Sequence, residues 1–128
     1  MSMKRWGVWC LASVMIATTA TSDVVDFEHT MVLTATAYNS VPEQTNSEPN
    51  IGAWGDSISP GMKVIAVSRD LLELGLTRGV EVTIDGLPGT FRVLDKMGRR
   101  WEKRIDIYMG DDLTKARRWG VRTVRVSW

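Results

Sequence analysis

The chain has few of the side chains that build metal and nucleophilic sites. Of its 128 residues only one is cysteine, Cys10, so a disulfide framework and a thiolate zinc site are excluded. Only one is histidine, His29, which argues against a histidine-based triad or a multi-histidine metal site. We therefore expect no metal and no cofactor, and any chemistry must come from carboxylates, Tyr, Thr, Lys or Arg.

The chain also lacks a strong net charge. The formal net charge of +1 argues against a nucleic-acid partner, and 44% apolar and 24% charged residues are ordinary for one folded domain. The charge is unevenly spread, because residues 23–56 carry acids and no Lys or Arg, whereas the bases of the domain lie in residues 57–128. The basic half favours either an anionic polymer or simply a solvated surface.

The first 22 residues have the three-part pattern of a secretory signal peptide. Lys4 and Arg5 precede an apolar run at residues 6–17, and small residues follow at 18–22. The run of about 12 residues is too short to span ~30 Å of hydrocarbon. We predict cleavage after residue 20 or 22, export to the periplasm or beyond, and no membrane insertion afterwards. An uncleaved N-terminal anchor is the alternative.

Hydrophobic alternation predicts an all-β domain of about six short strands with one or two small helices. A small barrel or a sandwich fits this pattern, and a barrel would remove exposed strand edges. The expected strands are residues 31–38, 64–67, 80–84, 90–94, 104–109 and 121–128, and the expected helical segments are 69–76 and 111–119.

The second helical segment shows a clear start and stop. Asp111 or Asp112 is expected to cap it, and Gly120 to end it. Leu113, Ala116 and Trp119 are expected to face inward.

Asp106 is the first candidate catalytic residue, because aspartate is disfavoured inside strands and here lies between two isoleucines. Its neighbours on the same strand face are Arg104 and Tyr108. It is either a carboxylate lining a groove or a solvent-facing residue paired with Arg104. Asp95 is the second candidate. It follows the strand ending at Leu94 and is either part of the same site or a turn residue.

Three further residues are candidate sugar-binding groups. Thr36 and Tyr38 share a strand face and could present hydroxyl groups, although Tyr38 is alternatively a core or rim aromatic. Trp54 lies in a glycine-flanked loop, where it either stacks on a sugar ring or packs against the protein. Five bases between Lys96 and Arg104 suggest a site for carboxylate-bearing ligands or a solvated edge.

Several segments in order resemble the three-aspartate (3D) domain family. They include Thr36–Tyr38, Gly52–Gly55, Val64–Val67, Val93–Asp95 and Arg104–Tyr108. The resemblance covers nearly all of residues 33–128, leaves residues 23–32 as an N-terminal extension, and implies a six-stranded double-psi β-barrel. The barrel is similar to the catalytic barrel of membrane-bound lytic transglycosylase A and to the expansin and RlpA-like barrels.

The resemblance also implies an activity. Asp106 matches the aspartate of the family's Ile-Asp-x-Tyr/Phe strand, where the transglycosylase has its catalytic acid, and Asp95 matches the aspartate that ends the preceding strand. The family's first aspartate is replaced by Ser68, and the threonine of its Thr-Ala-x-Gly motif by Gly52.

We therefore predict a monomeric, exported enzyme that cleaves peptidoglycan glycan strands by a lytic transglycosylase mechanism. Asp106 would be its acid and base, Asp95 its partner carboxylate, and Thr36, Tyr38, Trp54, Arg104 and Tyr108 would bind substrate. The alternatives are a non-catalytic module that binds cell-wall glycan through Tyr38, Trp54 and Tyr108, and a structural component of an envelope or phage particle. Ser68 favours the alternatives, whereas Asp95 and Asp106 favour the enzyme.

Overall fold

Residues 27–40 and 51–128 are described by a computed structural model of the chain. The predicted signal peptide lies outside the described residues. No helix among the described residues has the length and apolar content that a membrane crossing requires.

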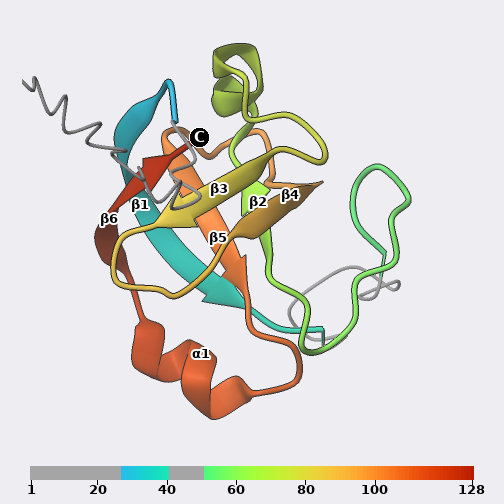
Figure 1. The fold of residues 1–128 in the computed structure, drawn as a ribbon. Helices are drawn as coiled ribbons and strands as arrows, with labels where there is room; N and C mark the ends of the chain where they lie inside the picture. Colours follow the sequence, from blue (N-terminus) through green and yellow to red (C-terminus); the bar gives the residue numbers. More distant parts are fainter. Residues whose placement is uncertain (1–26, 41–50) are drawn as a thin grey trace, which may run out of the picture.

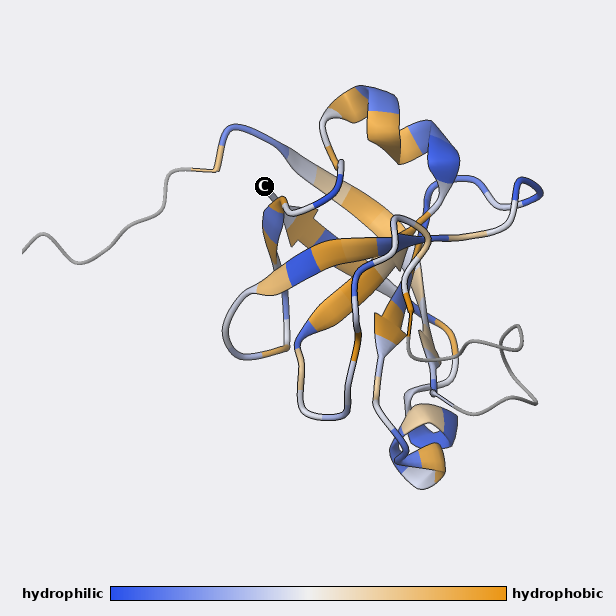
Figure 2. Ribbon diagram, turned by 90° about the vertical axis from the view of Figure 1, so that its right-hand side faces the viewer, coloured by the Kyte–Doolittle hydropathy of each residue, from blue (hydrophilic) through white to orange (hydrophobic). Residues whose placement is uncertain are grey.

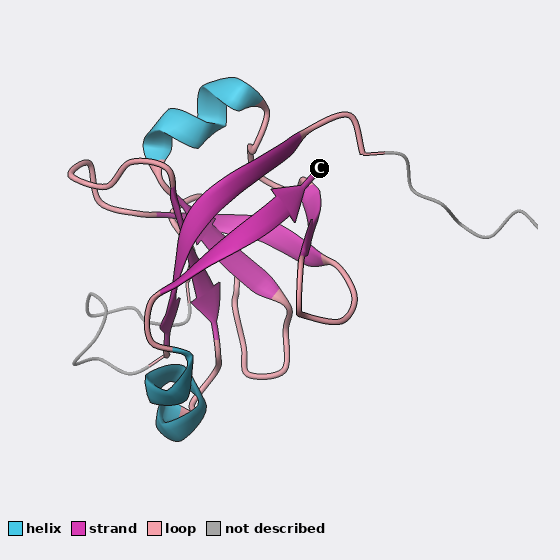
Figure 3. Ribbon diagram, turned by 90° about the vertical axis from the view of Figure 1, so that its left-hand side faces the viewer, coloured by secondary structure: helices cyan, strands magenta, loops and turns pink. Residues whose placement is uncertain are grey.

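Six strands close into a barrel in the order β1-β5-β2-β4-β3-β6 (Figure 1). The strands are β1 (Thr30–Tyr38), β2 (Val64–Val67), β3 (Glu81–Ile84), β4 (Phe91–Lys96), β5 (Arg104–Tyr108) and β6 (Arg122–Ser127). Two short helices complete the fold, the 3₁₀-helix η1 (Arg69–Leu74) and the α-helix α1 (Leu113–Trp119). Figure 3 shows them at opposite ends of the barrel. The barrel, and not the sandwich, is therefore the architecture.

The strand pairing is mixed. β1 runs parallel to β5, and β2 runs parallel to β4, while β2 and β5 are antiparallel neighbours. The two parallel pairs thus interlock at the β2–β5 contact, as in a double-psi barrel. This confirms the fold class predicted from the sequence.

Strand alternation separates the barrel interior from its outer face. In β1, β2 and β5 the odd-numbered residues are turned inward, and Ala35 pairs with Ile105 while Ile65 pairs with Ile107. All four are fully buried, and the strands are strongly apolar in Figure 2. The even-numbered residues of the same strands therefore lie on the outer face.

Most predicted bounds of the strands and helices differ from the observed ones by one or two residues, and three details matter most. β1 begins at Thr30, one residue earlier than predicted. Just before it, the backbone of His29 is hydrogen-bonded to the backbone of Trp128. β4 continues through Asp95 to Lys96 instead of ending at Leu94. Leu113, expected to face inward, is 38% exposed because it lies at the open first turn of α1.

The other helix signals are confirmed. The side chain of Asp112 accepts a hydrogen bond from the backbone N–H of Lys115 and caps α1, and Gly120 ends it. Trp119 is buried, and its indole N–H donates to the Ala35 carbonyl. This contact fastens α1 to the barrel.

Candidate functional site

One row of four side chains crosses the outer face of the barrel. Thr36 on β1 pairs with Asp106 on β5, Asp106 pairs with Ala66 on β2, and Ala66 pairs with Asp95 on β4. Register partners project from the same side of a sheet, so the two aspartates share one face. Their strands follow one another in the sequence, but β2 lies between them in the barrel. Ala66, the residue between the two aspartates, is itself buried, with 4% of its surface exposed.

A β-bulge turns Asp95 toward this face. Ile65 pairs with Val93, but the register then shifts, and Ala66 pairs with Asp95 instead of Leu94. Without the extra residue the alternation would direct Asp95 into the barrel interior. The bulge therefore explains how an apolar strand delivers a carboxylate to the outer surface.

Asp95 is held by three hydrogen-bond donors. Its Oδ1 accepts from the backbone N–H of Ala53 at 2.8 Å and of Lys96 at 2.9 Å, and its Oδ2 accepts from the Tyr38 hydroxyl at 3.4 Å. Burial raises the pKa of Asp95, while these donors and the Lys96 charge oppose the rise. Such a carboxylate is fixed in place and is suited to act as a stationary charge.

Gly52 makes the Ala53 contact possible. A Cβ atom at this position would lie 2.1 Å from the carbonyl oxygen of Leu94. The loop therefore approaches β4 closely only because residue 52 has no side chain. The replacement of the family's threonine by glycine thus has a local steric reason.

Asp106 is half-buried and more weakly held. Among the described residues its side chain accepts one hydrogen bond, from the Thr36 hydroxyl at 3.1 Å. Burial raises its pKa to about 6, the Asp95 charge adds to the rise, and the Thr36 hydrogen bond and the Arg104 charge oppose it. A carboxyl with this pKa is partly protonated near neutral pH and can both give and take a proton.

Arg104 does not form the ion pair with Asp106 that the sequence left open. No ion pair within 4.0 Å joins the two in the described part of the chain, where such pairs link Arg78 to Asp56 and Arg92 to Glu81. The Arg104 guanidinium instead lies 4.2 Å from the centre of the Trp101 ring. Asp106 is therefore a half-buried carboxyl on the outer face and not one half of a surface ion pair.

Tyr38 lies beside both aspartates. Burial raises its pKa, and the negative charges of Asp95 and Asp106 raise it further, so the phenol stays protonated and donates to Asp95. Its ring centre is 5.4 Å from that of Tyr108, which is only 4% exposed and hydrogen-bonded through its hydroxyl to Ser40. Tyr38 thus adds a hydroxyl group beside the two aspartates, whereas Tyr108 is buried and packs against the Tyr38 ring.

Trp54 is packed and not presented as an open ring. It lies against the barrel core, partly buried, and the Lys96 ammonium is 5.1 Å from its ring centre. Of the two readings of Trp54, the structure matches packing. Its position after Ala53 still places it next to Asp95.

Ser68 and Asp70 have a structural role that the sequence analysis missed. The Ser68 hydroxyl oxygen accepts from the Arg104 N–H at 3.0 Å, and an Asp70 carboxylate oxygen accepts from the Lys103 N–H at 2.9 Å. Both contacts fix the start of β5, the strand that carries Asp106. The signal available in the sequence was the pair of short polar side chains directly after a buried strand.

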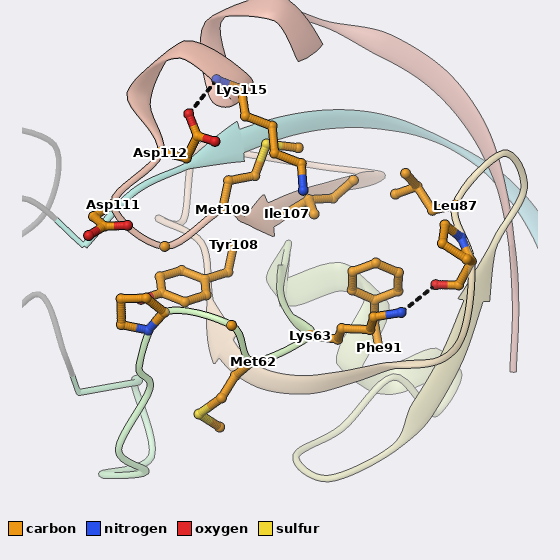
Figure 4. Close-up of a pocket in the computed structure, with 14 residues that line it drawn as sticks. Met62, Lys63, Leu87, Phe91, Ile107, Tyr108, Met109, Asp111, Asp112 and Lys115 are labelled. Atoms are coloured by element: carbon orange, nitrogen blue, oxygen red, sulfur yellow. Dashed lines mark hydrogen bonds between the residues drawn. The ribbon is translucent and has the colours of Figure 1, made fainter.

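A separate cavity of about 330 Å³ lies beyond the end of β5 near the start of α1 (Figure 4). Its walls include Phe91, Ile107 and Met109, with the side chains of Lys63 and Lys115 over them. It shares Tyr108 with the outer face, but neither Asp95 nor Asp106 lines it. Among the described residues, no cluster of three or more His, Cys, Asp or Glu side chains is arranged to hold a metal ion.

Comparison with known proteins finds similar folds and no family. No family model matches the chain, and no curated protein sequence matches it. An expansin of Clavibacter michiganensis has 18% identity and a TM-score of 0.52 over 78% of this chain and 50% of its own. A mutant of that expansin in complex with cellohexaose has 17% identity and a TM-score of 0.52, over the same shares of the two chains.

A third solved structure, the Streptomyces papain inhibitor, is of similar size. It has 21% identity and a TM-score of 0.51, over 79% of this chain and 94% of its own. The chain spans half the length of the expansin. At these identities the likeness concerns the barrel fold alone.

Proposed function

We propose that the protein is an exported enzyme that cleaves the glycan strands of peptidoglycan, with Asp106 as its acid and base. The observation that carries the proposal is the state of Asp106, a half-buried carboxyl whose pKa is raised to about 6 beside a second carboxyl. The general acid of a glycosidase is a carboxyl whose surroundings raise its pKa in the same manner. The resemblance of the chain to the three-aspartate domain family, with Asp95 and Asp106 matched, gives the same assignment.

The reaction needs only one proton-transferring group. Asp106 gives its proton to the glycosidic oxygen as the bond from that oxygen to the muramic C1 breaks. The C6 hydroxyl oxygen of the same sugar then bonds to C1, and its proton passes to the Asp106 carboxylate. The product carries a 1,6-anhydro ring, no water is consumed, and Asp106 returns to its starting state.

The different hydrogen bonding of the two aspartates divides their roles. Asp95 accepts from two backbone N–H groups and from Tyr38, so its charge is anchored. We assign it the stabilisation of the positive charge that develops on the sugar ring. Asp106, held by Thr36 alone among the described residues, has an oxygen free to meet the leaving group.

Two further observations bear on the substrate and the location. A mutant of the expansin whose fold this chain resembles has been solved in complex with cellohexaose, a β-linked glycan, and this supports a glycan as the substrate class. Peptidoglycan lies outside the cytoplasmic membrane, so the proposal requires the export that residues 1–22 predict. Intact mass of secreted or periplasmic protein should give a chain that begins after residue 20 or 22, and retention of Met1 would contradict export.

The reaction type is tested by incubating the purified protein with peptidoglycan in H₂¹⁸O and analysing the fragments by mass spectrometry. The proposed chemistry yields 1,6-anhydro ends without ¹⁸O. Reducing ends that contain ¹⁸O would show hydrolysis by water and overturn the transglycosylase mechanism. Absence of any cleavage across several peptidoglycan types would overturn the enzyme assignment.

A glycan-binding module without catalysis is the second candidate, favoured by Ser68 in place of the family's first aspartate. It predicts binding without cleavage, insensitive to Asp106→Asn and lost in Tyr38→Ala or Trp54→Ala. The burial of Tyr108 and the packing of Trp54 leave little open aromatic surface for sugar stacking. We therefore place the enzyme first.

A further inference from the structure

The loop that joins β4 to β5 carries an unusual density of positive charge beside the two aspartates. Five bases and a single acid, Glu102, lie between residues 96 and 104. We call the five bases the basic rim: Lys96, Arg99, Arg100, Lys103 and Arg104. Lys96 directly follows Asp95, and Arg104 lies two residues before Asp106 on the same strand face, so the rim borders the site.

No side chain of the basic rim forms an ion pair within 4.0 Å among the described residues, although the charges of Lys96 and Arg104 act to lower the pKa of Asp95 and of Asp106. The ion pairs within 4.0 Å that the described residues form, Arg78–Asp56 and Arg92–Glu81, lie elsewhere. Asp70 approaches the loop, but its carboxylate accepts from the backbone N–H of Lys103. Clustered cations that are not held in ion pairs raise the local concentration of anions.

The backbone of the loop is rigidly anchored. Met97 is buried, its N–H donates to the Val67 carbonyl, and its own carbonyl accepts from the Arg69 side chain. At the other end, Asp70 and Ser68 hold the N–H groups of the last two rim residues. Both ends of the loop therefore keep their place relative to Asp95 and Asp106.

Two guanidinium groups are also held in place. Those of Arg100 and Arg104 lie 4.4 Å and 4.2 Å from the centre of the Trp101 ring. Stacking of this kind leaves the N–H edges of a guanidinium available and reduces the conformational entropy lost on binding an anion. Planar guanidinium groups suit carboxylates, which they bind through two parallel hydrogen bonds.

We infer that the basic rim binds carboxylate groups carried by the glycan and so selects acidic glycans over neutral ones. The inference rests on the proposed function, because it places the substrate across Asp95 and Asp106. In peptidoglycan the carboxylate comes from the lactyl group of muramic acid or from the attached peptide. Neutral β-linked glycans such as chitin and cellulose oligomers lack it.

The selection of acidic over neutral glycans is tested by measuring the binding of matched oligosaccharides by calorimetry. The protein carries Asp106→Asn, so that it does not cleave the probes. Two probes are acidic: a peptide-free tetrasaccharide of alternating N-acetylglucosamine and N-acetylmuramic acid, and the same tetrasaccharide with its peptides. The third, chitotetraose, is neutral. We expect at least tenfold tighter binding of the acidic probes at low salt, lost as salt rises. The peptide-free probe distinguishes the lactyl carboxylate from the peptide carboxylates.

The rim is tested by adding Arg99→Gln and Arg100→Gln together. The control adds Arg117→Gln and Arg125→Gln, which remove the same charge from exposed positions outside the rim. The rim variant should lose about tenfold in affinity for an acidic probe and less than twofold for chitotetraose, and the control should lose little for either. Equal affinity for acidic and neutral probes, or equal losses in both variants, would overturn the inference.

The experiment also separates the inference from the proposed function. Selective binding of acidic probes by a protein that never cleaves peptidoglycan would support the rim and contradict the enzyme. Cleavage of peptidoglycan by a protein whose binding does not depend on the rim would support the enzyme and contradict the inference about the rim. Stronger binding of a glycerol phosphate oligomer than of either carboxylate probe would overturn the choice of carboxylate.

Discussion

Asp95 and Asp106 flank Ala66 from opposite sides of β2, and the charge of Asp95 raises the pKa of Asp106. Burial also raises the pKa of Asp95, but its two backbone N–H donors and Tyr38 oppose that rise and hold the carboxylate in place. The two carboxyls therefore differ in their surroundings, and Asp106, with a pKa raised to about 6, is the one to which the proposed cleavage assigns the proton transfer.

Asp95→Asn should move the pH dependence of cleavage toward lower pH. Removing the negative charge of Asp95 favours ionised Asp106, so the pKa of Asp106 falls and its proton is lost at lower pH. The high-pH limb of the kcat/KM profile therefore shifts down, and the maximal rate falls less than in Asp106→Asn. A limb that stays in place or moves up would show that Asp95 does not act on Asp106 through its charge.

Thr36→Val should shift the high-pH limb of the kcat/KM profile toward higher pH. The Thr36 hydroxyl donates to the Asp106 carboxylate and lowers its pKa, so its removal raises that pKa. Val has nearly the shape of Thr and keeps β1 paired with β5. The pH profile of kcat/KM for this variant is the measurement, and a downward shift would contradict the assigned hydrogen bond.

Asp106→Asn should stabilise the folded protein at neutral pH. The carboxyl has a pKa of about 6 when folded and 3.8 as its ordinary value, so the folded state binds more protons between these limits and loses stability as pH rises through them. Asn removes this cost. Urea unfolding should give a gain of about 1–3 kcal/mol at pH 7.5 and almost none below pH 4.

The control for this measurement is Asp85→Asn, which alters an exposed aspartate in the β3–β4 turn. It should change the free energy of unfolding by less than about 0.5 kcal/mol at both pH values. Asp106→Asn that destabilises the protein at pH 7.5 would show that the ionised carboxylate is favoured by the fold, against the raised pKa.

Gly52→Ala should weaken both the fold and the site. The added Cβ would lie 2.1 Å from the Leu94 carbonyl oxygen, so the loop must move away from β4 and carry the Ala53 N–H away from Asp95. We expect a loss of about 1–3 kcal/mol in unfolding free energy and a drop in cleavage. Gly98→Ala, where nothing lies within 4 Å of the new atom, should leave both unchanged.

Local patterns sufficed to predict most of the elements. The alternation at residues 80–84 placed Val82 and Ile84 in the core, and Asp112 and Gly120 bounded α1 as expected. These features depend on neighbouring residues, whose periodicity and capping chemistry are visible in the sequence.

The features that assemble the site depend on contacts between distant segments. The insertion of β2 between the two aspartate-bearing strands follows from parallel pairing of β2 with β4, which no local pattern reveals. The bulge that turns Asp95 outward is a matter of register between strands. The packing of Trp54 likewise depends on which surface its loop meets.

The rate of peptidoglycan cleavage by Asp106→Asn, compared with the unaltered protein and with Asp85→Asn, tests the central claim most directly. Asn keeps the shape of the side chain but cannot give and take a proton, so cleavage should fall on the order of 10²–10⁴-fold while glycan binding and folding persist. Asp85→Asn should cleave at the unaltered rate. Cleavage by Asp106→Asn at a rate near that of the unaltered protein would show that Asp106 is not the acid.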